Sequence, residues 1–213
     1  MEKTKQTQKK RKKKVRLIDY HGRRSGVIAT IATDIAKREG LEAEFYSGGL
    51  PDGDGGNYKQ ESDRIVGSKY ALPFKGTEAG GLVELIENTE VGPVNQEEIK
   101  ESDLVLTINP HIIEGMKKAG LDTEKAQPLM QYLGYQDWRL WIDAPDYVLE
   151  RIMADIGKGP KKETYSYISV FNGQRAIENS QEAFALYSGD AIRAAKELVY
   201  KLKEKENEPN SDK

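Results

Sequence analysis

The stretch VRLIDYHGRRSGVIATIATDIAKREG, residues 15–40, decides the fold. Its first five residues are mostly apolar and predict a buried strand, which a polar loop follows. Residues 26–39 then repeat apolar side chains at helical spacing. Ser25 stands at the expected N-cap, and the final glycine predicts the helix end. Residues 41–46 alternate apolar and acidic side chains and predict a second strand. A strand, a helix and a strand in this order predict parallel strands and an α/β fold.

The later sequence continues with elements of both kinds. Residues 104–108 (LVLTI) predict a strand buried on both faces, and residues 111–119 predict the helix that follows it. Asn95 is the expected cap of a short helix over residues 96–102. The remaining predicted elements are helices at 58–67, 80–88 and 147–156, strands at 138–142 and 164–171, and a long helix at 180–204 with a break signal at 188–190.

Composition excludes several classes of protein. Among the 213 residues, 37% are hydrophobic and 32% are charged, a balance typical of a globular domain with a very polar surface. No apolar run approaches the roughly 20 residues of a membrane span, and no apolar segment follows the basic N-terminus, so we expect a cytoplasmic protein and no membrane contact. Cysteine is absent, which excludes disulfides, thiolate metal sites and a cysteine nucleophile. With only two histidines as well, we expect no metal centre and no cofactor.

Charge separates a folded body from two polar ends. The run from Lys9 to Lys14 is unbroken basic sequence, although the whole chain has a net charge of −2. We expect a disordered basic tail over residues 1–14, one α/β domain over 15–204 and a disordered polar tail over 205–213. The basic run is either a solvated tail or a weak, salt-dependent contact to nucleic acid or another polyanion.

Four segments occur in the order that low-molecular-weight protein tyrosine phosphatases use. Residues 15–32 resemble that family's opening strand, its loop of pattern C-x5-R-S and its first helix, with Arg24 and Ser25 matching the Arg-Ser pair. Residues 45–49 (FYSGG) resemble the turn after the second strand. Residues 101–110 (ESDLVLTINP) resemble the third strand, and residues 143–147 (DAPDY) resemble the segment that carries the general acid.

The resemblance implies a three-layer α/β/α sandwich with a central four-stranded parallel sheet and insertions near residues 50–92 and 148–180. It also implies an anion site at the loop after the first strand. In the family, backbone N–H groups at the helix N-terminus hold the phosphate, an arginine clamps it, a thiolate attacks phosphorus and an aspartic acid protonates the leaving oxygen. The positions carried over as anion-binding are Tyr20, His21, Gly22, Arg23, Arg24 and Ser25.

The family's nucleophile has no counterpart here. Alignment on Arg24 without a gap puts Ile18 at its position, and a loop shorter by one residue puts Asp19 there. Neither side chain replaces a thiolate. Asp19 therefore has two interpretations: it caps the turn, or it acts as a nucleophile or cation ligand. Asp146 is correspondingly either the general acid or the N-cap of a helix.

Three functional hypotheses follow. The first is a non-catalytic phosphatase-like module, a pseudophosphatase, that binds phosphate, a phosphorylated ligand or a protein partner through residues 20–25. The second is a metal-assisted phosphohydrolase in which Asp19 and Asp146 are catalytic. The third is binding of nucleic acid or another polyanion through the run from Lys9 to Lys14.

Overall fold

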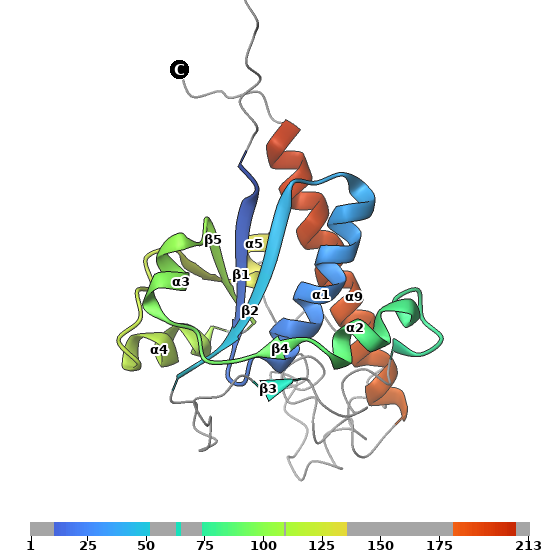
Figure 1. Ribbon diagram of the computed structural model, residues 1–213, viewed down its shortest axis with the longest axis horizontal. Coiled ribbons are helices and arrows are strands. Elements are labelled where there is room, and N and C mark those ends of the chain that lie inside the picture. The colour runs from blue at the N-terminus through green and yellow to red at the C-terminus, as the bar shows by residue number, and fades with distance from the viewer. Residues whose placement is uncertain (1–10, 52–62, 65–73, 109, 136–180, 208–213) are drawn as a thin grey trace, which may run out of the picture.

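A parallel sheet between two layers of helices forms the body of the molecule (Figure 1). The computed structural model describes residues 11–51, 63–64, 74–108, 110–135 and 181–207. The sheet has four strands in the order β2-β1-β5-β6, and every neighbouring pair is parallel. The expected three-layer α/β/α fold with a central four-stranded parallel sheet is therefore confirmed. The strands are β1 (Lys13–Asp19), β2 (Ala43–Gly49), β5 (Leu104–Thr107) and β6 (Ala126–Pro128).

β1 lies inside the sheet and is buried on both faces. It pairs with β2 on one side and with β5 on the other, and residues 15–19 are all buried. Val15 and Leu17 belong to the larger hydrophobic cluster, whereas Ile18 belongs to a smaller cluster on the opposite face. This alternation follows from the two-residue period of a strand. It explains why an almost continuous apolar run marks a central strand in a parallel sheet.

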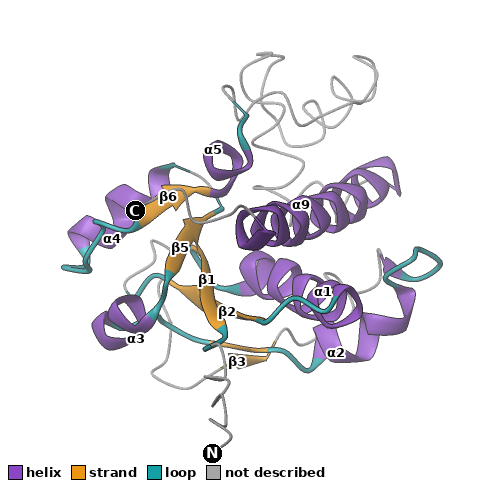
Figure 2. Cartoon of the chain, turned by 90° about the horizontal axis from the view of Figure 1, so that it is seen from above, coloured by secondary structure: helices purple, strands orange, loops and turns teal. Residues whose placement is uncertain are grey.

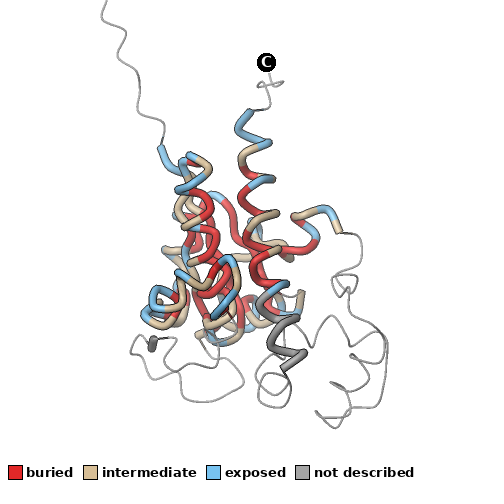
Figure 3. Tube along the Cα trace, turned by 90° about the vertical axis from the view of Figure 1, so that its right-hand side faces the viewer, coloured by how far each residue is buried: buried red, intermediate tan, exposed pale blue. Residues whose placement is uncertain are grey.

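Two long helices cover one face of the sheet, as Figure 2 shows. α1 (Arg23–Glu39) and α9 (Gln181–Asn207) pack against each other, and both contribute to the larger cluster. Their buried side chains recur along one side of each helix, as expected for helices on a sheet. Figure 3 shows that the buried residues gather inside the body of the molecule, with exposed residues on its outside.

Shorter helices cover the other face. α3 (Gln96–Glu101) and α4 (His111–Lys118) contribute the buried Ile99, Ile112 and Met116 to the smaller cluster. Asn95 caps α3 as predicted, because its side chain accepts from Glu98 N while the Glu98 carboxylate accepts from Asn95 N.

A small subdomain joins the body beside β2. It contains a two-stranded antiparallel sheet of β3 (Asp63–Arg64) and β4 (Glu90–Val91), the 3₁₀ turn η2 (Gly80–Leu82) and α2 (Val83–Glu87). Phe74, Ile86 and Val91 are buried in the larger cluster, so residues 74–91 pack into the main core.

Several boundaries differ from the sequence-based prediction. β1 begins at Lys13, so the expected tail over residues 1–14 is wrong for its last two residues. α9 passes through the break signal without interruption and ends at Asn207, beyond the expected domain end at residue 204. The helix predicted over 58–67 is wrong at least at Asp63–Arg64, which form β3.

The fourth strand of the sheet was not predicted. The sequence predicted later strands at 138–142 and 164–171, but the fourth strand of the sheet, β6, is Ala126–Pro128, followed directly by α5 (Leu129–Leu133). β6 has no apolar run and ends in proline, and its three residues are only partly buried, so no strand signal marks it. The elements predicted over residues 138–171 lie outside the described residues.

Within the described part of the chain, no helix combines the length and the apolar character that crossing a membrane requires.

Candidate anion loop

The predicted site lies between the carboxyl end of β1 and the first turn of α1. Asp19 is the last residue of β1, and α1 begins at Arg23. In open α/β sheets this edge, outside the carboxyl ends of the strands, is where ligands bind. The structure thus places the predicted residues 19–25 together, as the last residue of β1, the connection 20–22 and the first turn of α1, and we call this segment the Asp19 loop.

The side chain of Asp19 fills the centre of this loop. Its Oδ1 accepts hydrogen bonds from His21 N at 2.7 Å and from Gly22 N, and its Oδ2 accepts from Arg24 N at 2.8 Å and Ser25 N at 2.9 Å. Asp19 is only 1% exposed. Four backbone N–H groups therefore converge on one point, and that point is occupied by a carboxylate of the same chain.

The position of Asp19 has a clear electrostatic basis. The first N–H groups of a helix have no partner inside the helix, and its N-terminus carries a partial positive charge. A carboxylate satisfies those donors with charge-assisted hydrogen bonds, as an anion would. The Arg24 guanidinium adds to this field, since its Nε lies 3.9 Å from Asp19 Oδ2 and its side chain is only 14% exposed.

Ser25 does not cap α1, which corrects the sequence-based expectation. It lies inside the first turn, and its hydroxyl donates to Gly22 O at 3.0 Å. The N–H groups of Arg24 and Ser25 instead donate to the side chain of Asp19, the last residue of β1. Of the two interpretations of Asp19, the cap of the turn matches this geometry.

Gly22 gives the loop its shape. Its φ of 72° lies in the left-handed region, which side chains with a Cβ adopt at a cost. A Cβ at this position would also approach Gly48 C, Gly49 N and Val91 Cβ, each at 3.2 Å. Conformation and space therefore both require glycine here.

The end of β2 supports the loop from the side. Leu50 N donates to Tyr20 O at 3.2 Å, and Gly49 N donates to Gly92 O at 2.8 Å. The FYSGG turn that carried part of the resemblance thus borders the loop. Residues 91–94 also lie beside the loop. The sequence did not identify them, because their valine, glycine and proline residues are typical of any loop that packs on a hydrophobic core.

His21 is exposed at the rim of the loop. Partial burial of its ring lowers its pKa below the ordinary value, and the charges of Arg24 and Arg23 act in the same direction. The carboxylate of Asp19 opposes this shift. The neutral imidazole is accordingly the favoured form near neutral pH.

The chemistry available at this loop differs from that of a phosphatase. The chain has no cysteine, and each oxygen of Asp19 already accepts two hydrogen bonds. In the described ranges, no group of three or more His, Asp or Glu side chains could hold a metal ion. Asp146 and the rest of the predicted acid segment, residues 143–147, lie outside the described residues.

Comparison with known proteins gives a fold but no close relative. No protein-family model matches the chain, and no curated protein matches it. Solved structures of low-molecular-weight protein tyrosine phosphatases do match. The enzyme from Bacillus subtilis superposes with a TM-score of 0.53 at 15% identity, over 91% of this chain and 99% of its own.

Solved structures from two other organisms give the same result. The low-molecular-weight protein tyrosine phosphatase from T. tengcongensis superposes with a TM-score of 0.54 at 13% identity, over 89% of this chain and 99% of its own. The protein tyrosine phosphatase from Entamoeba histolytica gives a TM-score of 0.55 at 10% identity, over 91% and 99%. This chain therefore has the fold of the low-molecular-weight protein tyrosine phosphatases, in a divergent form that contains no cysteine.

Proposed function

We propose that the protein is a non-catalytic, phosphatase-like binding module, a pseudophosphatase. The observation that carries this proposal is the carboxylate of Asp19 on the four N–H groups of the loop. In the fold's enzymes such donors serve a phosphate beside a thiolate. Here an internal anion takes the donors, and no thiolate is present. The loop can keep its shape without performing phosphoryl transfer.

The ligand of this module contacts the rim of the loop rather than its centre. A free phosphate that entered the centre would have to displace a buried carboxylate from four hydrogen bonds, against the repulsion of two negative charges. His21 is exposed and Arg23 is partly exposed, and the charge of Arg23 acts on the His21 ring, so the two residues offer positive charge and a hydrogen-bonding ring beside each other. We therefore expect a phosphorylated or carboxylate-bearing partner to bind through these side chains, with modest affinity.

Two measurements test the proposal. Turnover of p-nitrophenyl phosphate should be absent, with or without Mg²⁺ or Mn²⁺. Titration with phosphotyrosine, followed by NMR, should shift the signals of residues 20–25 weakly. Arg23→Ala should abolish these shifts, whereas Arg38→Ala, an exposed arginine at the other end of α1, should leave them unchanged. Equal shifts in both variants would show that the rim is not the binding site.

The metal-assisted hydrolysis hypothesis has less support. It needs a lone pair of Asp19 to reach phosphorus or a cation, and both oxygens of this carboxylate are directed at backbone donors. Metal-dependent turnover that disappears in Asp19→Asn would restore this hypothesis and overturn the non-catalytic one.

A further inference from the structure

We propose that the amino end of β1, with Arg11, Lys12 and Lys14, binds single-stranded nucleic acid by exchanging neighbouring carboxylates for backbone phosphates. This surface lies at the edge of the sheet opposite the Asp19 loop, because β1 runs from Lys13 to Asp19. The inference is independent of the function proposed for that loop.

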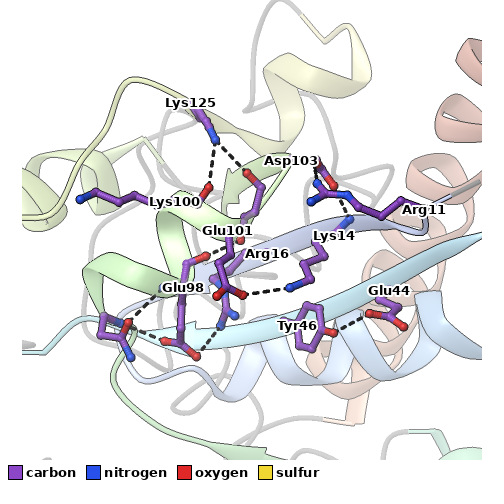
Figure 4. Close-up of polar contacts among 12 residues, drawn as sticks. Arg11, Lys14, Arg16, Glu44, Tyr46, Glu98, Lys100, Glu101, Asp103 and Lys125 are labelled. Carbon is purple, nitrogen blue, oxygen red and sulfur yellow. Dashed lines mark hydrogen bonds and ion pairs between the residues drawn. The ribbon is translucent and has the colours of Figure 1, made fainter.

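The three cations are held by carboxylates from other elements, as Figure 4 shows for two of them. Arg11 pairs with Asp103, Lys12 with Glu44 at 3.4 Å, and Lys14 with Glu101 at 2.9 Å. We call this set of three ion pairs the charge belt. The cations stand at the start of β1, and their partners come from β2, α3 and the turn before β5.

The belt lies at the amino end of β1, where α3 contributes one of its carboxylates and the side chains remain partly exposed. Lys14 pairs in register with Glu44, and Arg16 with Tyr46, so these four side chains share one face. α3 reaches this face with only six residues, and the apolar cluster beneath it is the smaller of the two. The face therefore presents polar side chains where the opposite face presents α1 and α9.

These pairs can be exchanged at low cost. One member of each pair is more than half exposed, namely Arg11 at 71%, Lys12 at 55% and Glu101 at 69%, and the other member is exposed by 32–38%. Exposed ion pairs contribute little free energy and are screened by salt. Arg11 and Lys12 also precede β1, so their side chains can turn to a phosphate without breaking the sheet.

Tyr46 favours nucleic acid over other polyanions. Tyr46 is 37% exposed on the same face, and the Arg16 guanidinium lies 5.2 Å from the centroid of its ring. Arg16 is itself nearly buried and pairs with Glu98 at 3.3 Å, so the ring has a fixed support. Aromatic rings beside a basic track are what single-stranded nucleic acids use for base stacking and phosphate contacts.

The carboxylates set the strength of this contact. They neutralise the cations in the free protein, and the whole chain has a net charge of −2, so binding should be weak at physiological salt. Removing the carboxyl charges while keeping the side-chain shape should release the cations. The relevant variant is Glu44→Gln with Glu101→Gln and Asp103→Asn.

A control variant that loses three carboxylates outside the belt has the same net charge as the belt variant. Comparing the two separates the release of the cations from the change in net charge. Glu84→Gln, Glu90→Gln and Glu114→Gln remove three exposed carboxylates from α2, β4 and α4. Fluorescence anisotropy with a labelled oligothymidylate at low salt should show about tenfold tighter binding by the belt variant than by the control. Adding Lys12→Ala and Lys14→Ala to the belt variant should reverse the gain.

Two outcomes overturn the inference. Equal affinities of the belt and control variants would mean that the carboxylates do not compete with phosphates. Tyr46→Ala should weaken binding of the oligothymidylate several-fold and leave heparin binding unchanged. If binding of the oligothymidylate and of heparin changes alike, the surface does not select nucleic acid.

Thermal melts check folding, and the single change Glu44→Gln, on an edge strand, provides a second variant if the triple change unfolds the chain.

Discussion

The carboxylate of Asp19 lies where four backbone N–H groups and the N-terminus of α1 favour a negative charge. This carboxylate stabilises the first turn of α1 and satisfies donors that burial would otherwise leave without partners. The same carboxylate occupies the four backbone donors that could otherwise hold an external anion.

We expect Asp19→Ala to destabilise the protein by about 3 kcal/mol, because several buried N–H groups lose their acceptor. Inorganic phosphate or sulfate should then restore part of the lost stability, since the anion can enter the vacated centre. Thermal melts with increasing phosphate measure this effect, and wild type should respond little. If phosphate raised the melting temperatures of wild type and variant equally, Asp19 would not be the group that fills the loop.

His21 provides a pH-dependent probe of the same loop. Partial burial and the nearby arginines lower its pKa, so the folded protein binds this proton less tightly than the unfolded chain does. This contribution to stability is present above the unfolded value of about 6.5 and is lost as pH falls below it. An NMR titration should show a midpoint below 6.5. In Asp19→Asn the midpoint should fall further, because the opposing carboxylate charge is gone; an increase would contradict the assigned causes.

At the level of elements, α9 shows how packing overrides a local sequence signal. The segment Ser-Gly-Asp at residues 188–190 suggested a break, yet the helix continues from Gln181 to Asn207. Ala191, Ala194, Ala195 and Leu198 are buried against the larger cluster, and this burial holds the helix together. Gly189 itself is exposed, with open space around its missing Cβ.

Gly189→Ala should therefore stabilise the protein by about 0.5–1 kcal/mol, the difference in helix propensity between the two residues. Gly40→Ala offers a matched comparison. It also has open space, but its φ of 68° at the end of α1 is unfavourable for alanine, so we expect it to destabilise. Urea denaturation of both variants measures these effects. Destabilisation by Gly189→Ala would indicate that α9 bends at this residue.

The sequence predicted the elements whose pattern is set by local burial. β1, α1 and β5 are buried runs or amphipathic repeats with clear ends, and each was placed to within a few residues. β6 could not be predicted, because Ala-Gln-Pro becomes a strand only through pairing with β5. The segment 19–25 was identified as the candidate site. Its main feature, a side chain turned back into its own loop, depends on the φ of Gly22 and on walls from residues 48–50 and 91–94.

Across the whole molecule, the two faces of the sheet are built differently. One face carries a large apolar cluster under α1 and α9, while the other has a small cluster and the charge belt. The first face provides most of the hydrophobic stabilisation, which pH hardly affects. The second face also carries the three ion pairs of the belt, whose carboxylates contribute to stability only while they are ionised.

The belt should add modestly to the acid sensitivity of the folded state. Hydrogen bonds from Tyr46 and Lys12 lower the pKa of Glu44, and the hydrogen bond from Lys14 lowers that of Glu101. Burial alone would raise the pKa of Asp103, but the backbone N–H of Lys14 and the charge of Arg11 lower it overall. Each group therefore binds its proton less tightly when folded. Its contribution to stability is present at neutral pH and is lost as pH falls through the folded-state pKa.

Replacing the three belt carboxylates with their amides should accordingly flatten the acid side of the stability profile. Urea midpoints measured from neutral pH down to about pH 3 should fall steeply for wild type and for the control variant Glu84→Gln/Glu90→Gln/Glu114→Gln. The belt variant should begin slightly less stable at neutral pH and lose less on acidification, because it has three fewer groups to protonate. Profiles that ran parallel for wild type and belt variant would show that the belt contributes nothing to folding. The acid sensitivity would then have to come from other carboxylates.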